Sequence, residues 1–177
     1  LPTGTGCGMS DAKLPDFQGG AEHASNVAVA ALSGANIIYE SAGMYSSLLG
    51  ACLESLLLDN DLLGACMRMV KGIAVNEETL AFDEIKDVCL NNKSHYLGSD
   101  QTISVMQTEY IYPDFYNRLS PNQWKDAGKP EALDVAIQKK NHILSSHFPK
   151  HISNEVDDKI RAEFPIFLSK ESMGRNG

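Results

Sequence analysis

The sequence has 177 residues and a formal net charge of -8 at neutral pH, from 15 Lys and Arg against 23 Asp and Glu. Hydrophobic residues make up 43% of it and charged residues 21%, which is ordinary for a globular domain and excludes general disorder. The acidic balance excludes a nonspecific nucleic-acid binder, which needs clustered Lys and Arg, and no apolar run is long enough for a membrane helix.

The first forty residues show the pattern of an α/β protein. Leu1–Gly8 predicts the end of a strand that opens into a glycine-rich loop. Asp16–Ser33 is rich in small residues with helical spacing, and Gly34 stands where a helix-terminating glycine belongs. Ala35–Glu40 predicts a short strand, and Ser41–Gly43 a second loop of small residues. This alternation is typical of parallel strands joined by helices.

The next segment predicts two helices, at Tyr45–Leu57 and Asp61–Lys71, with a break near Leu58–Asn60. The four cysteines contain no closely spaced pair, which excludes a zinc ribbon and argues against a disulfide scaffold. Because the five histidines also lack a metal-ligand spacing, we expect no protein-bound metal. The chain is therefore expected to be reduced and cytoplasmic. Three cysteines in helical patterns are expected to be small buried side chains: Cys52, Cys66 and Cys89.

Four more helices are expected towards the C-terminus. Asn76 should cap the first of them. A helix is preferred to a strand at Thr102–Tyr112, because Ser99 can cap its N-terminus. Pro130 fits the first turn of the third helix, and Asn154 begins the fourth.

The glycine-rich loop Gly4–Gly8 raises the possibility of a nucleotide site. However, Met9 stands where the third glycine of a dinucleotide fingerprint would lie, and Ser10–Pro15 separates the glycines from the helix. A bound phosphate would then not meet a helix N-terminus, which makes a nicotinamide cofactor a poor interpretation. Ligands of α/β proteins bind beyond the carboxyl ends of parallel strands, so both loops should open onto one face.

The segment Ser10–Glu22 (SDAKLPDFQGGAE) resembles the S-D-x-K-x-P-D-x-Q-x-G-x-E signature of the trimethylamine methyltransferase family. This signature is long, irregular and hard to produce by chance. Later segments resemble further parts of the family in the same order: Gly34–Asn36, Gly43, Glu54–Asp59, His95–Gly98 with Thr102, and Glu109–Gly128. The resemblance covers essentially the whole chain, whereas full-length members are much longer. We therefore expect a fragment of a longer polypeptide.

The resemblance implies a fold and an activity. The fold would be the C-terminal portion of a TIM (β/α)8-type barrel with additional C-terminal helices, and residues 1–177 would form a single unit. Members of the family move a methyl group from a methylated amine to the Co(I) centre of a separate corrinoid protein. Cobalamin would thus be presented by a partner and not tightly bound by this chain. A homo-oligomer is also expected.

Archaeal trimethylamine enzymes of the family carry pyrrolysine just before the S-D-x-K motif. Met9 takes that place here, or Gly8 if the short glycine run shifts the alignment. Without pyrrolysine, the chain resembles the branch whose substrates are quaternary amines such as glycine betaine. A quaternary ammonium already carries a neutral amine as leaving group, so its displacement needs no prior protonation.

The resemblance points to three catalytic candidates in the first loop: Met9, Asp11 and Lys13. Met9 is singled out only by its position before the motif. Asp11 and Lys13 could orient the substrate, or they could form a local salt bridge that closes a tight turn.

Substrate-binding candidates lie on the first helix and after the second strand: Gln18, Glu22, Tyr39, Glu40 and Gly43. Gln18 and Glu22 are one turn apart and share a face, which would also suit a solvated first turn. Glu40 could attract a substrate cation or accept a structural hydrogen bond. Tyr39 and Tyr45 could offer aromatic faces to an ammonium ion, although single aromatic residues are more often part of a core.

Two other functions remain open from the residues alone. The chain could be a catalytically inactive assembly or docking module, because most barrel strands would be missing from it. It could instead belong to a barrel enzyme for a phosphorylated substrate, with Gly4–Gly8 as an anion-binding loop.

Overall fold

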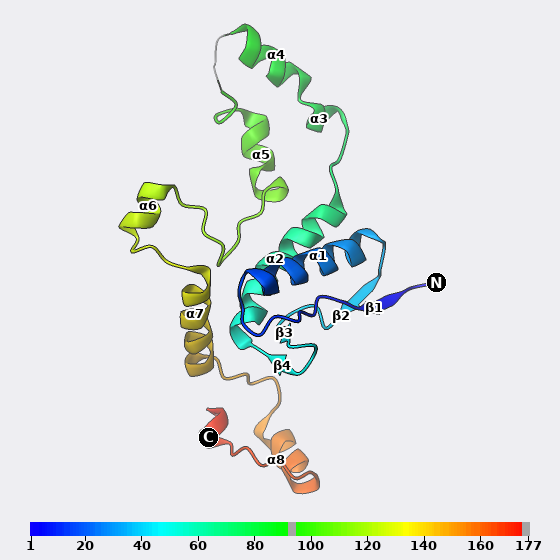
Figure 1. Ribbon diagram of the computed structural model, residues 1–177, viewed down its shortest axis with the longest axis vertical. Coiled ribbons are helices and arrows are strands. Elements are labelled where there is room, and N and C mark those ends of the chain that lie inside the picture. Colours follow the sequence, from blue (N-terminus) through cyan, green and yellow to red (C-terminus); the bar gives the residue numbers. More distant parts are fainter. Residues whose placement is uncertain (92–94, 175–177) are drawn as a thin grey trace. The chain divides into compact units, whose positions relative to one another are not determined.

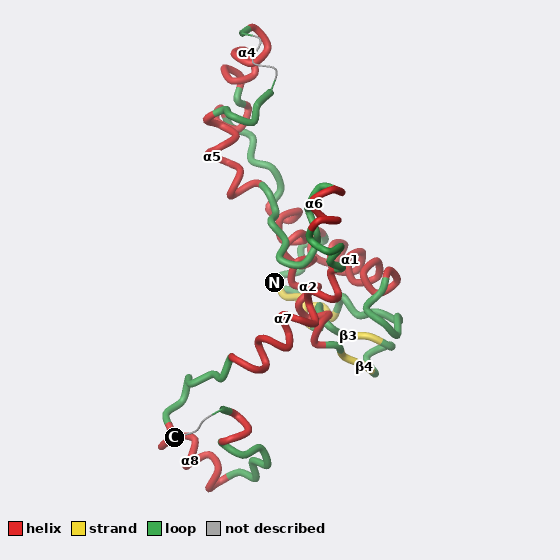
Figure 2. The backbone as a smooth tube through the Cα atoms, turned by 90° about the vertical axis from the view of Figure 1, so that its left-hand side faces the viewer, coloured by secondary structure: helices red, strands yellow, loops and turns green. Residues whose placement is uncertain are grey.

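The computed structural model describes residues 1–91 and 95–174, and helices dominate this part of the chain (Figures 1 and 2). Its contacts divide it into two compact units, Leu1–Ala136 and Ile137–Gly177. A few short strands among many helices are compatible with a fragment of an α/β domain. The strands of the described residues do not themselves form a barrel. The single unit expected from the sequence stays a prediction.

The first unit opens with the predicted strand, helix and strand. Strands β1 (Gly4–Gly6) and β2 (Ile37–Tyr39) pair in parallel, with Gly4 opposite Ile37, and helix α1 (Phe17–Leu32) connects them. The Asp16 side chain caps the helix by accepting from the Gly19 N–H. Gly34, at φ 88°, donates its N–H to the Ala31 carbonyl at the other end. The sequence expectations for this segment are confirmed.

A small antiparallel pair follows that the sequence did not predict. Strands β3 (Met44–Tyr45) and β4 (Gly50–Ala51) pair with Tyr45 opposite Gly50. Three consecutive residues in the turn between them have positive φ: Ser46, Ser47 and Leu48. Tyr45 therefore lies in a strand, and the helix expected from that residue begins only at Leu53.

Helix α2 (Leu53–Lys71) is continuous, so the predicted break near Leu58–Asn60 was wrong. Aspartates in mid-helix usually favour turns because their side chains compete for nearby backbone groups. Here the carboxylates of Asp59 and Asp61 accept hydrogen bonds from groups outside the helix. They do not compete with the helical backbone, and the helix continues.

Helices α1 and α2 pack against each other and form the apolar core of the unit. Val27 of α1 meets Leu62 and Cys66 of α2, and all three side chains are buried. Ala24 and Ala28 flank the contact and let the two helices approach closely. The core thus fixes the two helices that follow the strand-end loops.

The segment after α2 contains two short helices in place of the one expected. Asn76 caps α3 (Glu77–Leu80) through a reciprocal bond pair with Thr79, as predicted for that cap. Ala81, at φ 47°, ends the helix, and α4 (Phe82–Leu90) begins directly after it. Among the cysteines expected to be buried, Cys66 is buried, Cys52 is half-buried and Cys89 is exposed. The expectation was wrong for Cys89, because α4 leaves it on a solvent-facing side.

Helix α5 (Asp100–Glu109) confirms the preference for a helix in this region, with Ser99 as its cap. The backbone after it is tied to α2, because Asp61 accepts from the N–H groups of Asp114, Phe115 and Tyr116. Glu109 also forms ion pairs with two basic residues of α2: Arg68 and Lys71.

Of the next two helices, only the second was predicted from the sequence. Helix α6 (Pro121–Asp126) was not predicted, although Ser120 and Gln123 form a reciprocal cap at its start. Helix α7 (Ala132–Ser146) is the helix expected around Pro130, but it begins two residues after that proline.

The second unit contains α8 (Asn154–Glu163), which begins where the sequence predicted and is capped by Ser153. A short 3-10 turn, η1 (Glu171–Met173), follows. Asp157 is buried and pairs with Arg161 and Lys170. Within residues 1–91 and 95–174, no helix combines the length and apolarity needed to cross a membrane.

Candidate active site

The two loops that follow β1 and β2 meet each other. Their backbones are joined by three hydrogen bonds: Ser10 N–H to the Met44 carbonyl (3.1 Å), Ser46 N–H to the Ala12 carbonyl (3.0 Å) and Ser47 N–H to the Ser10 carbonyl (3.3 Å). The first loop, residues 7–15, and the second loop, residues 40–49, therefore form one surface beside α1. This arrangement is the one expected for loops that leave neighbouring parallel strands.

An open pocket of about 350 Å³ lies where these loops meet α1. Its lining residues come from both loops and the helix: Met9, Ser10, Asp11, Glu22, Asn26, Ser47 and Leu48. Three of the residues singled out in the sequence, Met9, Asp11 and Glu22, are thus brought together. Of the described residues lining the pocket, none is a Lys, Arg or His, so carboxylates dominate its charge.

Glu22 is the most constrained carboxylate of the pocket. One carboxylate oxygen, Oε2, accepts from the Ser10 hydroxyl (2.7 Å) and the Asp11 N–H (2.8 Å), while Oε1 accepts from the Gln18 amide (2.8 Å). The hydrogen bond from Ser10 contributes most to holding the pKa of Glu22 below its ordinary value, followed by the one from Gln18. Glu22 is therefore a fixed negative charge that also orders the first loop.

Asp11 and Lys13 do not meet through their charged groups. The Asp11 carboxylate accepts a short hydrogen bond from the Ser47 hydroxyl, which ties the first loop to the second. Lys13 Nζ donates to the main-chain carbonyl of Asp11 (2.5 Å). The Asp11 carboxylate consequently stays at the pocket, and Lys13 supports the turn behind it.

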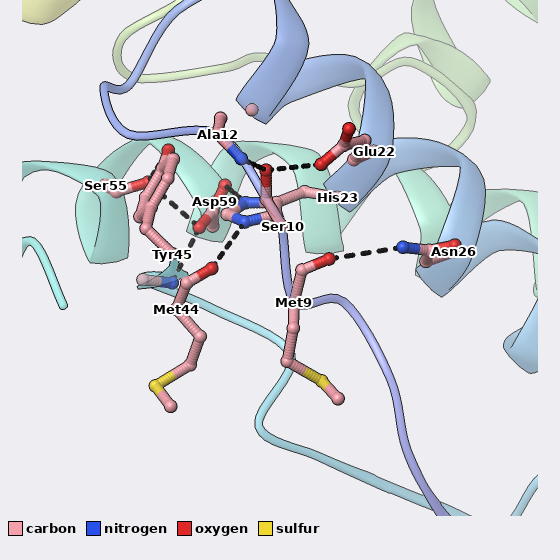
Figure 3. Close-up of polar contacts among 12 residues, drawn as sticks. Met9, Ser10, Ala12, Glu22, His23, Asn26, Met44, Tyr45, Ser55 and Asp59 are labelled. Atoms are coloured by element: carbon pink, nitrogen blue, oxygen red, sulfur yellow. Dashed lines mark hydrogen bonds and ion pairs between the residues drawn. The ribbon is translucent and has the colours of Figure 1, made fainter. Parts of the chain in front are cut away.

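Met9 lies beside Asn26, whose side-chain amide donates to the Met9 carbonyl (3.2 Å). In Figure 3 the side chains of Met9 and Met44 both extend away from α1. The preceding residue cannot present a side chain: a Cβ on Gly8 would lie 2.7 Å from Val27 Cγ2 and 2.9 Å from Ser41 Cα. Met9, and not Gly8, is therefore the residue before Ser10 whose side chain can point out of the loop.

A buried polar network lies under the pocket loops (Figure 3). The His23 ring is fully buried and bridges two elements: Nδ1 faces Asp59 Oδ1 of α2 (3.0 Å), and Nε2 faces the Met44 carbonyl of β3 (3.1 Å). Asp59 Oδ2 also accepts from the Gly43 N–H (2.8 Å) and the Ser55 hydroxyl (3.2 Å). The network joins α1, α2 and the second loop at one point.

Opposing effects act on the pKa of His23. Burial lowers the pKa, but the hydrogen bond and the negative charge of Asp59 outweigh it, and the pKa is raised overall. The ring of Tyr45 packs beside His23 with 5.0 Å between ring centroids, and burial raises the pKa of Tyr45. Its hydroxyl meets the Ser55 hydroxyl at 2.7 Å. Tyr45 therefore belongs to the buried network, which corrects its proposed role as an exposed aromatic face.

The remaining predicted site residues lie outside the pocket lining. Tyr39 and Glu40 lie over β1, where a Cβ on Gly6 would come within 3.0 Å of the Tyr39 ring and 3.2 Å of Glu40 Oε2. Both side chains are exposed. Gly43 is buried and donates to Asp59. Gln18 reaches the pocket only through its bond to Glu22.

Sequence reasoning missed His23 and Asp59, although a signal for them existed. On α1 the buried positions are Gly19, His23 and Val27, which recur every four residues. A histidine in the middle of such a stripe, opposite an aspartate in a buried stripe of another helix, indicates an internal polar pair. The described residues contain no group of three or more His, Cys, Asp or Glu side chains arranged to hold a metal.

The model of the family described as trimethylamine methyltransferase (MTTB) matches residues 1–173. Trimethylamine methyltransferase MttB from Methanosarcina barkeri (strain Fusaro / DSM 804) is 35% identical over 147 residues, which are 83% of this chain and 29% of that protein. MttB from Methanosarcina thermophila is 32% identical, over 92% of this chain and 33% of that protein.

A second kind of relative has a different substrate in its name. Glycine betaine methyltransferase from Desulfitobacterium hafniense (strain Y51) is 26% identical over 162 residues, which are 92% of this chain and 33% of that protein. The chain therefore spans about a third of the length of the curated relatives that it matches.

Proposed function

Since the chain belongs to the trimethylamine methyltransferase family, we propose that its acidic pocket is part of the site where a methylated amine gives up a methyl group. The acceptor in this proposal is the Co(I) centre of a corrinoid that a partner protein presents. The chain itself would bind and orient the amine and would contribute the loops after two barrel strands.

The observation that carries the proposal is the pair of carboxylates at the pocket. Asp11 and Glu22 both line it, and the described lining contains no basic side chain. A methylated ammonium ion has few or no N–H groups to donate, so it is recognised by negative charge and shape more than by hydrogen bonds. Glu22 is already supplied with three donors, which leaves it as a fixed source of negative potential. The same carboxylates would repel a phosphorylated substrate.

Met9 bears on the kind of amine. The proposal that Met9 takes the place of pyrrolysine is supported by the crowding around Gly8, where a side chain would collide with the Ser41 backbone. Methyl transfer breaks the C–N bond, and its electron pair stays on nitrogen. A quaternary ammonium thereby leaves as a neutral tertiary amine without prior protonation. We therefore assign a quaternary amine as the preferred substrate.

The finer fold is part of the same proposal. In a TIM barrel the active site is built from the loops at the carboxyl ends of parallel strands. Strands β1 and β2 are parallel, and the loops that follow them meet at the pocket. This supports the assignment of the chain to the C-terminal part of such a barrel. Catalysis would rest mainly on positioning, because no covalent enzyme intermediate is required.

The test is a methyl-transfer assay with the full-length protein that contains this chain. Reduced corrinoid protein is mixed with tetramethylammonium, glycine betaine or trimethylamine, and the cobalt absorption is followed. We expect methylation with a quaternary amine and little with trimethylamine. Glu22→Gln should lower kcat/KM by ~10-fold or more, because the substrate cation loses a fixed countercharge.

The matched control is Glu155→Gln, which removes an equal charge from the exposed face of α8. It should leave kcat/KM unchanged. If no donor methylates the cobalt, the activity proposal fails, and the chain is better described as an assembly or docking module. If trimethylamine is the best donor, the substrate assignment fails while the activity stands.

A further inference from the structure

The environment of the His23 ring restricts its protonation. Nε2 faces the carbonyl oxygen of Met44 at 3.1 Å, and a carbonyl can only accept a hydrogen bond. Nε2 must therefore carry a proton. Nδ1 faces Asp59 Oδ1 at 3.0 Å, so a second proton lies between these two atoms. The remaining question is whether this proton belongs to the ring or to the carboxylate.

The other contacts of Asp59 answer that question. Its second oxygen, Oδ2, accepts from the Gly43 N–H (2.8 Å) and the Ser55 hydroxyl (3.2 Å). Because Ser55 gives its proton to Asp59, the Tyr45 hydroxyl donates to Ser55 Oγ (2.7 Å). The two donors at Oδ2 stabilise the ionised carboxylate. The shared proton accordingly belongs to Nδ1.

We propose that His23 is a doubly protonated imidazolium held by Asp59, and that this buried ion pair is the positioning element that fixes both pocket loops. The ring is fully buried and the Asp59 side chain is 4% exposed. A buried charge is tolerated only when it is paired and hydrogen-bonded, and both conditions are met here. The link from this pair to methyl transfer rests on the proposed function, whereas the ion pair itself does not.

Two hydrogen bonds connect the pair to Ser10, which lines the pocket. The Met44 carbonyl accepts from both His23 Nε2 and the Ser10 N–H. The Ser10 hydroxyl in turn donates to Glu22, whose carboxylate lines the pocket. The second loop is thus fixed directly through Met44 and Gly43, and the first loop through Ser10.

Loss of one proton would disrupt this geometry. A neutral imidazole has a single N–H, so it can donate to Met44 or to Asp59 but not to both. The charged and titratable groups that face the ring are Asp59 from α2, Tyr45 from β3 and Glu22 from its own helix. The carboxylates favour the charged ring. Since the pKa of His23 is raised in the fold, the stabilisation is complete at pH values below the ordinary pKa and is lost as pH rises through the folded one.

The direct test is the protonation state of His23 in the full-length protein, measured by ¹⁵N NMR after labelling of histidine. The ring signals of His23 are identified as those that move in Asp59→Asn, which changes the direct neighbour of the ring. Because the ring is fully buried, a soluble paramagnetic agent should not broaden these signals. His95, His142, His147 and His151 are exposed and should be broadened. At about pH 7 we expect both ring nitrogens of His23 to carry protons. A ring with one unprotonated nitrogen would overturn the proposal.

The second test measures the loops by hydrogen exchange across pH. In the wild-type protein, exchange at residues 43–47, corrected for the intrinsic rate, should rise by ~10-fold between neutral and alkaline pH. Asp59→Asn can accept from Gly43 and donate to a neutral Nδ1, so Nε2 still reaches Met44. This variant should keep the loops ordered but lose the pH dependence. An unchanged pH dependence in Asp59→Asn would contradict the proposal.

His142→Gln is the matched control, since it removes an exposed histidine of α7. Residues 43–47 of this variant should show the same hydrogen exchange as the wild type at each pH. Neither measurement uses methyl transfer. If the cobalt assay fails but the ring is an imidazolium, only the proposed function falls. If methyl transfer is found with a neutral His23, only the ion pair falls.

Discussion

The α1–α2 region and the exposed face of α8 both use acidic side chains, but they use them differently. In the α1–α2 region, Asp59 and Asp61 are less than a tenth exposed. Asp59 accepts hydrogen bonds from α1 and from the second loop, and Asp61 accepts from the segment that follows α5. On α8, the ion pair between Lys159 and Glu155 is 70% and 77% exposed and joins neighbouring turns of one helix. The buried carboxylates determine where loops lie, whereas the exposed carboxylate lies on the surface of a helix that is already formed.

The physical reason for the difference is solvation. Water competes for an exposed ion pair, so such a pair contributes little free energy. A buried carboxylate cannot return to water, so each donor that it loses leaves an unsatisfied group behind. The number of ion pairs in each unit is therefore a poor guide to what holds it together. Two substitutions would sharpen or break this comparison, and a third tests the crowding at Gly8.

Asp61→Ala should have the largest effect of the three. It removes the acceptor of three backbone N–H groups, those of Asp114, Phe115 and Tyr116. Because the Phe115 N–H is buried, we expect a loss of about 3 kcal/mol in the free energy of unfolding, measured by urea denaturation. Hydrogen exchange at residues 114–116 should increase as well.

The control for this prediction is Asp114→Ala, which alters an exposed carboxylate in the same segment. It should change stability by less than about 0.5 kcal/mol. An equal effect from both variants would mean that burial does not distinguish the two carboxylates, and the comparison between the regions would fail.

Gly8→Ala should have an intermediate effect that is confined to the first loop. Gly8 has φ 98°, and an added Cβ would press on Val27 and on the Ser41 backbone. We expect a loss of about 2–3 kcal/mol from strain and overpacking together. Gly34→Ala is the matched control: its φ is 88°, but no atom lies within 4 Å of the added Cβ. It should cost only about 1 kcal/mol.

The difference in stability between these two glycine variants separates the effect of the steric collision from the effect of the positive φ. If Gly34→Ala is as destabilising as Gly8→Ala, a Cβ that collides with Ser41 adds nothing to the loss of stability. Met9 would then no longer be favoured over Gly8 as the residue that presents a side chain before Ser10.

These regions also differ in how far the sequence reveals them. Local signals identified α1, between Asp16 and Gly34, because helical periodicity and a terminating glycine are properties of a short segment. The resemblance carried by Ser10–Glu22 singled out Asp11 and Glu22, which line one pocket. Their roles in binding or catalysis stay predictions. What the sequence could not supply was the partner of each polar side chain. Ser47 reaches Asp11 across 36 positions, and no local pattern indicates this.

The same limit explains the errors in α2. Asp59 and Asn60 suggested a break because aspartates and asparagines in a helix usually compete for its backbone. The helix continues because His23 and Gly43 occupy the Asp59 carboxylate, and these residues lie in other elements. Tertiary contacts thus override a local preference at the position where the buried network is built.

Lys159→Ala should have the smallest effect of the three. The pair with Glu155 lies on the exposed face of α8, at i and i+4, so its loss should cost about 0.3–0.5 kcal/mol, and less at high salt. Urea denaturation at low and high salt measures both the loss and its screening. Arg161→Ala provides the contrast on the same helix, because Arg161 pairs with the buried Asp157 and also donates to the Leu168 carbonyl. If Lys159→Ala and Arg161→Ala lowered the free energy of unfolding equally, solvent exposure would not determine how much an ion pair of this unit contributes to stability. The contrast with the buried carboxylates of α2 would then rest on geometry alone.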